Sequence, residues 1–249
     1  MTAGERLILA LDLPSWREAE GIVERLRGKI SLFKVGLELF TREGPHVIER
    51  IRQRGGRVFL DLKLHDIPRT VAAAAAAAVE WGVFMLDLHV AGGQEMMEAA
   101  VASVGERAGR LRVERPRLLG VTVLTSLTDE DLKRLGVHHS VESQVLQMAT
   151  AAKRVGLDGV VASPLEAARI RTHLGRDFLI VTPGIRSSGT PSDFDDESNR
   201  IEDQRRTLPP REALQAGADY LVIGRPILRA KDPVQAVEAL ILAMHPSSP

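Results

Sequence analysis

Cysteine is absent from this 249-residue sequence, and aromatic residues make up only 4% of it. Without cysteine the chain has no disulfide, no thiolate nucleophile and no cysteine-ligated zinc, which fits a reducing compartment. The 33 basic and 33 acidic residues cancel, which argues against a dominant attraction to nucleic acid or to an anionic membrane. A local basic pocket for a small anion is still compatible with this balance.

Long hydrophobic runs are also missing. The first apolar stretch, 7–11, is too short for the core of a signal peptide and precedes no small-residue cleavage site. No run approaches the roughly 18 apolar residues that a membrane span needs. Hydrophobic residues nevertheless make up 44% of the chain, which is enough for a sizeable core. We therefore expect a soluble, cytoplasmic protein with no membrane partner.

Short apolar segments alternate with helical patterns along the whole chain. Strands are predicted at 7–13, 31–36, 57–64, 83–90, 118–124, 158–162, 178–182 and 220–224. Helices are predicted at 16–26, 44–54, 70–81, 95–104, 141–155, 165–173, 210–216 and 233–244. Strict alternation favours a parallel sheet, because parallel neighbours are joined by crossovers that are usually helical.

Eight strand–helix units in about 250 residues predict an α/β protein with a single (β/α)8 TIM barrel spanning 1–249. A doubly wound open sheet is the alternative, but the first strand is not followed by the GxGxxG of a dinucleotide-binding version. The alanine run 72–78 predicts a helix that packs closely on a neighbour or on a second subunit.

The stretch 190–203 breaks the rhythm of strands and helices. It carries six acidic residues against one basic residue and has little apolar periodicity. We interpret it as part of a mobile loop at about 186–206 that follows the seventh strand.

The third strand carries charge where a barrel strand is usually apolar. Its leucines alternate with Asp61 and Lys63, so the leucines face the helices and these two charges point into the barrel. Asp66 follows in the next loop. The same period of two places Asp12 on the inner face of the first strand and Lys34 on the inner face of the second. These charges are expected to converge at the carboxyl ends of the strands.

We interpret this cluster as catalytic, with a purely structural network of ion pairs as the alternative. Buried ion pairs contribute little net stability, because desolvation offsets their attraction, so a chain without use for them could pack apolar residues there. A neighbouring carboxylate keeps a lysine in its ammonium form, and an ammonium group in a dry pocket is a good general acid.

Phosphate binding is predicted after the last two strands, where barrels frequently hold this group. Gly224 allows a close backbone approach, and Arg225 can pair with phosphate oxygens in a fork. Arg186 follows the seventh strand, and Gln204 is expected to turn inward at the end of the acidic loop. The histidines show no metal-binding spacing, so no metal site is predicted.

The third strand and its loop read FLDLKLHDIP, followed by Thr70 and Val71. This segment closely resembles the signature of orotidine 5′-monophosphate decarboxylase in its bacterial form. The resemblance also covers 9–12, 33–36, 88–93, 121–126, 182–186, 203–206 and 222–227, and so spans nearly the whole chain.

The resemblance implies a homodimeric barrel that converts orotidine 5′-monophosphate to UMP and CO2, the last step of de novo pyrimidine synthesis, without metal or organic cofactor. In this family Lys63 would protonate C6 of the pyrimidine as CO2 leaves. Asp61 would lie beside the substrate carboxylate, and Lys34 would hold Asp61 and contact the ribose. Asp66 and Thr70 would come from the partner subunit.

The resemblance also implies the remaining contacts with the substrate. Asp12 would bind ribose hydroxyls, and Thr125 and Ser126 would contact the ribose and base. Ile67 would also contact the substrate. The phosphate would be held by Arg186, Gln204, Gly224 and Arg225, with the loop ending at Gln204 closing over it.

Three positions depart from the family pattern without removing a catalytic group. Arg69 stands where asparagine is usual, Asp87 where asparagine is frequent, and Val90 where alanine is common. Two other functions stay open. One is a metal-dependent phosphosugar synthase or decarboxylase on the same barrel, and the other is a non-catalytic nucleotide-binding barrel.

Overall fold

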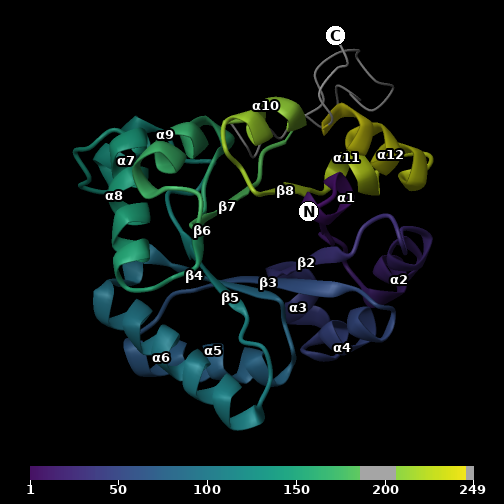
Figure 1. The fold of residues 1–249 in the computed structure, drawn as a ribbon, viewed down its shortest axis with the longest axis horizontal. Helices are drawn as coiled ribbons and strands as arrows, with labels where there is room; N and C mark the ends of the chain where they lie inside the picture. The colour runs from purple at the N-terminus through teal and green to yellow at the C-terminus, as the bar shows by residue number, and fades with distance from the viewer. Residues whose placement is uncertain (186–205, 245–249) are drawn as a thin grey trace.

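The computed structural model describes residues 1–185 and 206–244. Its strands close into one barrel in chain order, and every pair of neighbours is parallel (Figure 1). The strands are β1 Leu7–Ala10, β2 Leu32–Gly36, β3 Arg57–Leu64, β4 Met85–His89, β5 Arg117–Val121, β6 Gly159–Val161, β7 Leu179–Thr182 and β8 Tyr220–Ile223. The predicted (β/α)8 barrel is confirmed.

Helices surround this barrel. The longer ones are α2 Trp16–Arg25, α4 His46–Gln53, α5 Pro68–Glu80, α6 Gln94–Leu111, α8 Val141–Arg154, α9 Pro164–Leu174 and α12 Pro233–Met244. The shorter ones are α1 Ala3–Arg6, α3 Leu37–Glu43, α7 Asp129–Arg134, α10 Pro210–Gln215, α11 Arg225–Leu228 and the 3₁₀ turn η1 Val90–Gly92. Of the α-helices, α1, α3, α7 and α11 were not predicted, because so few turns do not show an apolar period.

Two apolar layers follow from the alternation of side chains along the strands. Leu7 and Leu9 of β1 face the helices, whereas Ile8 and Ala10 join an inner cluster with Phe59. The other members of the inner cluster are Leu32, Met85, Leu119, Val181, Tyr220 and Val222. This cluster fills the barrel on the amino side of the site, because Phe59 precedes Asp61 on the same face of β3.

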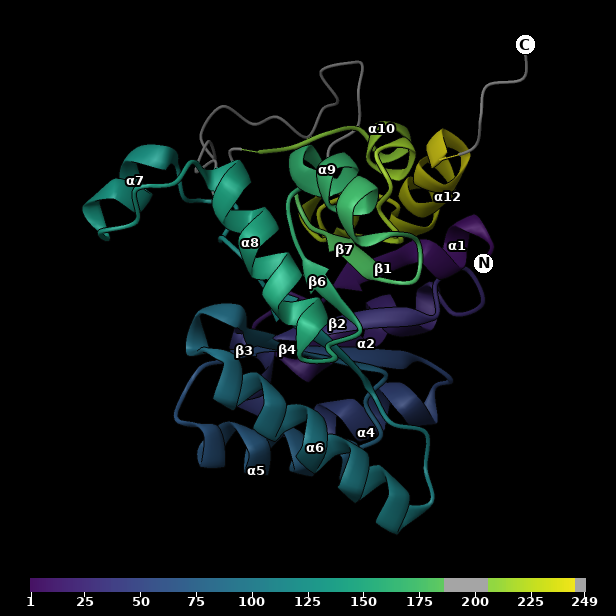
Figure 2. The same cartoon turned by 60° about the vertical axis from the view of Figure 1, so that its left-hand side comes forward.

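The alanine run lies in α5, which packs side by side with α6 (Figure 2). Ala75 and Ala78 are buried there, and the Ser103 hydroxyl of α6 donates to the Ala72 carbonyl at 2.9 Å. Small side chains therefore let two helices of the same chain approach closely. Contact of this run with a second subunit stays a prediction.

The largest difference from the prediction is in α6, which ends at Leu111 rather than at 104, and the next largest lie where strands end. β1 stops at Ala10 rather than at 13, and β5 stops at Val121 rather than at 124, so the chain beyond each is loop. The predicted mobile loop lies almost wholly outside the described residues, together with Arg186 and Gln204. Within 1–185 and 206–244, no helix combines the length and hydropathy that crossing a membrane requires.

Candidate active site

Four of the predicted charges meet at the carboxyl ends of β1, β2 and β3. The Lys34 ammonium lies 3.0 Å from Asp12 Oδ1 and 3.1 Å from Asp61 Oδ2. Lys63 pairs with the other oxygen of Asp61. Asp12, Lys34, Asp61 and Lys63 thus form a continuous line of alternating sign, here called the charge row. Lys34 and Asp61 are buried, whereas Asp12 is exposed.

The charge row is ionised throughout its buried part. Burial favours the neutral form of Asp61, but Lys34, a hydrogen bond from Asp87 and the charge of Lys63 outweigh it and hold the pKa of Asp61 well below its usual range. Burial likewise disfavours the Lys34 ammonium, yet Asp61 and Asp12 outweigh it and raise the pKa of Lys34. Each buried charge is therefore kept by its neighbours of opposite sign.

Two glycines make room for the charge row. A Cβ atom at Gly36 would lie 2.9 Å from the Lys34 ammonium nitrogen, so any side chain there would displace it. At the end of β8, a Cβ at Gly224 would come 3.5 Å from Asp12 Oδ2. Gly224 therefore borders the charge row directly, and Arg225 follows at the start of α11, exposed at the same end of the barrel.

A bulge in β3 presents Lys63. Leu60 pairs with Leu86 and Leu64 with Leu88, so four residues of β3 advance against two of β4. Lys63 has φ +49°, in the left-handed region that non-glycine residues rarely adopt. Such a strained backbone persists only where surrounding contacts hold it in place, and strained residues are concentrated at functional sites.

Asp87 on β4 supplies one of the contacts that hold this bulge. Its side chain is completely buried, and Oδ1 accepts a hydrogen bond from the Lys63 backbone N–H at 2.8 Å. In the sequence Asp87 stands out only as a departure from the family pattern, and no site role was predicted for it. The sequence offered one sign of its importance, which is a single carboxylate among the apolar residues Met85, Leu86 and Leu88 of β4.

Asp66, Ile67 and Thr70 lie at the rim, outside the charge row. All three are exposed, and Asp66 Oδ1 accepts the Ile67 N–H at 2.6 Å. Within the described chain no ion pair connects Asp66 with Lys63. In the described chain these three side chains therefore take no part in the ion pairs of the charge row.

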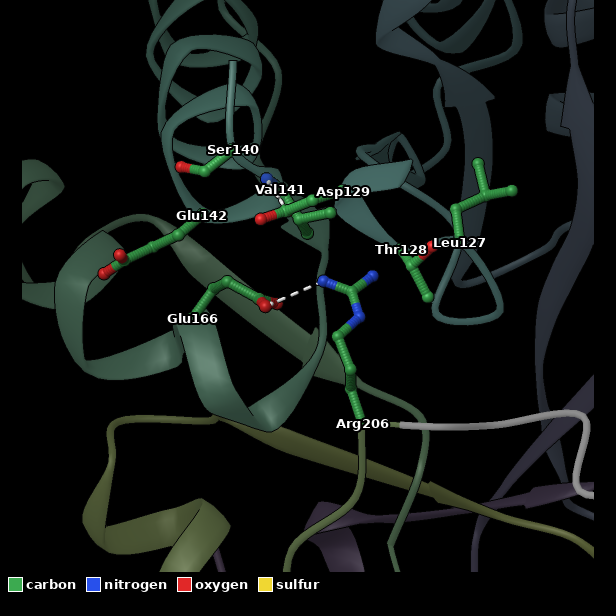
Figure 3. A pocket seen from close by; sticks show the side chains of 8 residues that line it. All are labelled: Leu127, Thr128, Asp129, Ser140, Val141, Glu142, Glu166 and Arg206. Atoms are coloured by element: carbon green, nitrogen blue, oxygen red, sulfur yellow. Dashed lines mark hydrogen bonds and ion pairs between the residues drawn. The ribbon is translucent and has the colours of Figure 1, made fainter. Parts of the chain in front are cut away.

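Arg206 holds the loop after β5. Its guanidinium donates to the carbonyls of Val123 at 3.3 Å and Leu124 at 3.0 Å, immediately before Thr125 and Ser126. It also pairs with Glu166 at 2.7 Å, beside an open pocket of about 360 Å³ (Figure 3). This pair was not predicted from the sequence, because its partners are 40 residues apart.

The Arg206–Glu166 pair is largely buried from solvent, because the two side chains are only 13% and 7% exposed. Burial raises the pKa of Glu166, although Arg206 opposes this shift. We expect Glu166→Ala to destabilise the fold by about 3 kcal/mol, because it leaves a buried guanidinium without its carboxylate. Urea unfolding followed by circular dichroism measures this loss.

Glu142→Ala is the matched control for Glu166→Ala. Glu142 pairs with Arg169 at 2.8 Å on the surface, where both side chains are about half exposed. Removing an exposed pair costs at most about 1 kcal/mol. Equal losses in the two variants would contradict the role assigned to Arg206 and Glu166.

Among the described residues, no group of three or more histidine, aspartate or glutamate side chains is arranged to hold a metal ion. The polar groups at the barrel mouth are instead the paired ammonium and carboxylate groups of the charge row. An arrangement of this kind can offer a fixed cation to developing negative charge.

The sequence model of the family described as "Orotidine 5'-phosphate decarboxylase / HUMPS family" matches residues 5–240. The chain belongs to this family. This membership agrees with the resemblance found from the β3 segment.

Curated members of the family are similar over almost their whole length. A protein of Trichlorobacter lovleyi named "Orotidine 5'-phosphate decarboxylase" is 49% identical over 239 residues, covering 96% of this chain and 95% of its own. One of Syntrophotalea carbinolica with the same name is 50% identical over 242 residues, covering 97% and 96%.

Solved structures of the family show the same fold. The orotidine 5'-phosphate decarboxylase of Lactobacillus acidophilus has a TM-score of 0.81 and 36% identity, covering 97% of this chain and all of its own. The enzyme of the same name from Pyrococcus horikoshii, with a TM-score of 0.74 and 23% identity, supports the fold alone.

Proposed function

We propose that this protein decarboxylates orotidine 5′-monophosphate to UMP and CO2, the last step of de novo pyrimidine synthesis. The observation that carries the proposal is the charge row, in which a partly exposed Lys63 is paired with a buried, ionised Asp61. Curated relatives that are about half identical to this chain carry the name of an enzyme of this reaction, which supports the proposal.

In this mechanism Lys63 donates its proton to C6 of the pyrimidine as the bond to CO2 breaks. Negative charge develops at C6 only on the way to products, so a fixed ammonium group there stabilises the transition state more than the substrate. Asp61 lies beside the departing carboxylate and repels it in the ground state. Lys34 holds Asp61 in place.

The rest of the substrate is proposed to bind around this centre. Asp12 takes ribose hydroxyls, and Thr125 and Ser126 contact ribose and base. Gly224 and Arg225 take the phosphate. Arg186 and Gln204, outside the described residues, complete the phosphate contacts. Binding energy from the distant phosphate can then be used to organise the reacting centre.

We further propose a cytoplasmic homodimer in which Asp66 and Thr70 enter the partner's site. Ile67, next to Asp66, is 66% exposed, and Leu37 at the carboxyl end of the adjacent strand is 57% exposed. A contiguous exposed apolar patch marks a protein–protein interaction site, and we propose that these two side chains belong to such a patch, which the second subunit covers.

The test is an absorbance assay of purified protein with orotidine 5′-monophosphate in the presence of EDTA. We expect loss of the long-wavelength absorbance of the substrate, with UMP as product, at the same rate with and without chelator. No loss of absorbance with folded protein, together with metal-dependent turnover of a phosphosugar, would favour a metal-dependent phosphosugar enzyme. Binding of UMP by folded protein that leaves the substrate unchanged would favour the non-catalytic barrel.

A further inference from the structure

Asp87 is a buried acid whose two oxygens face different groups. Oδ1 accepts the Lys63 N–H, as described above. Among the described residues no N–H or hydroxyl donor reaches Oδ2, which is fully buried. Yet the Asp87 side chain is within hydrogen-bonding contact of the Asp61 carboxylate. Two carboxyl groups can form such a bond only if one of them carries a proton.

The proton belongs on Asp87 because the surroundings of the two acids differ. Asp61 is paired with both Lys34 and Lys63, which favours its ionised form. Among the described residues, the Lys63 backbone N–H is the only donor to Asp87, which lies next to the charge of Asp61. Burial, that charge and the shared hydrogen bond raise the pKa of Asp87 well above its usual range.

We infer that Asp87 is a positioning residue: a neutral carboxylic acid that accepts the Lys63 N–H through one oxygen and donates its proton to Asp61 through the other. The inference rests on the proposed function for its catalytic consequence. Asp87 then stabilises the left-handed backbone of Lys63 and the orientation of Asp61 together, without adding a second negative charge beside the ammonium group.

An asparagine can make the same two contacts, with its carbonyl toward Lys63 and its amide toward Asp61. Asp87→Asn is therefore expected to keep kcat within about tenfold of wild type, the range of one altered hydrogen bond. Asp87→Leu has neither contact and is expected to lower kcat about a hundredfold, the effect of a small misplacement of reacting groups. The affinity for UMP, measured by calorimetry, should change little in both.

The pH dependence separates a neutral acid from a merely structural side chain. The charges that act on Asp87 are Asp61 and Lys63 from β3, while β5 places the apolar Leu119 opposite it. His89 follows on β4, and its pKa is lowered by burial and by His65 and Lys63. Lys34 on β2 also carries a charge in this region, and it pairs with Asp61 on β3.

The sign of the pH effect follows from the raised pKa of Asp87. The acid ionises only at a pH well above that of an ordinary aspartate, and its ionisation removes its donated hydrogen bond and places a second carboxylate beside Asp61. Wild-type kcat should therefore fall on the alkaline side. In Asp87→Asn this group cannot ionise, so the fall should move to higher pH.

The decisive experiment is an infrared difference spectrum of wild type against Asp87→Asn at pH 7, with no substrate present. We expect wild type to show the carbonyl band of a protonated carboxylic acid that the variant lacks. An unchanged spectrum, or the same alkaline fall in both proteins, would overturn the inference. The readout does not depend on turnover, so failure of wild type to decarboxylate the nucleotide would count against the proposed function alone.

Discussion

Lys63→Ala is expected to abolish turnover while UMP binding survives. The ammonium group acts on charge that develops at C6, so its loss removes both a general acid and an electrostatic stabiliser. Together these effects predict a fall in kcat of at least about 10⁴-fold. The UMP affinity should stay within about tenfold, because the phosphate and ribose contacts are made elsewhere. Steady-state kinetics and titration calorimetry measure the two quantities.

Lys133→Ala is the matched control, since Lys133 lies exposed on α7, away from the charge row. It should behave as wild type in both measurements. Turnover near the wild-type rate in Lys63→Ala would contradict the assignment of Lys63 as the proton donor. Loss of UMP binding in a folded Lys63→Ala protein would show that this side chain contributes to ground-state binding instead.

Mixing Lys63→Ala with Asp66→Ala is expected to restore activity to two inactive proteins. If Asp66 enters the partner's site, a hybrid dimer has one site with both residues intact and one site with neither. With random exchange half of the dimers are hybrids, so about a quarter of the wild-type sites should be active. The reason to expect a shared site is that Asp66 lies exposed at the rim, outside the charge row of its own chain.

The control for this experiment is a mixture of Lys63→Ala with Lys34→Ala. Both residues lie in the charge row of one chain, so every site in that hybrid lacks at least one of them. No activity should return. Subunit exchange is verified by co-purification of differently tagged chains. Absence of recovery in the first mixture, with exchange demonstrated, would contradict the shared site.

The charge row was predictable because a strand has a strict period of two. Alternating leucine and charged residues in β3 are sufficient to place Asp61 and Lys63 on the inner face. Parallel neighbours in a closed barrel then bring Lys34 and Asp12 to the same end, and the observed ion pairs agree. The β3 segment also led to the family that the whole-chain comparison identifies.

The bulge in β3 and the contacts of Asp87 were not predictable in this way. The bulge shifts the pairing of β3 with β4, and the period-two pattern of β3 does not record such a shift, because it depends on contacts between the two strands. Gly36 is similar, because its importance lies in the space that the Lys34 ammonium occupies. The contacts of Arg206 join segments separated by about 40 to 83 residues, and no local pattern records them.

The sequence by itself determined the eight-unit barrel, the inner and outer faces of its strands and the chemical types of residue at its mouth. Local periodicity specifies these features, and burial of apolar side chains enforces them. Only the tertiary structure decided which oxygen pairs with which ammonium group and that Asp87 holds the Lys63 backbone. It also decided that Asp66 stands apart from the charge row. Such details depend on distances of a few ångströms between segments that meet only after folding.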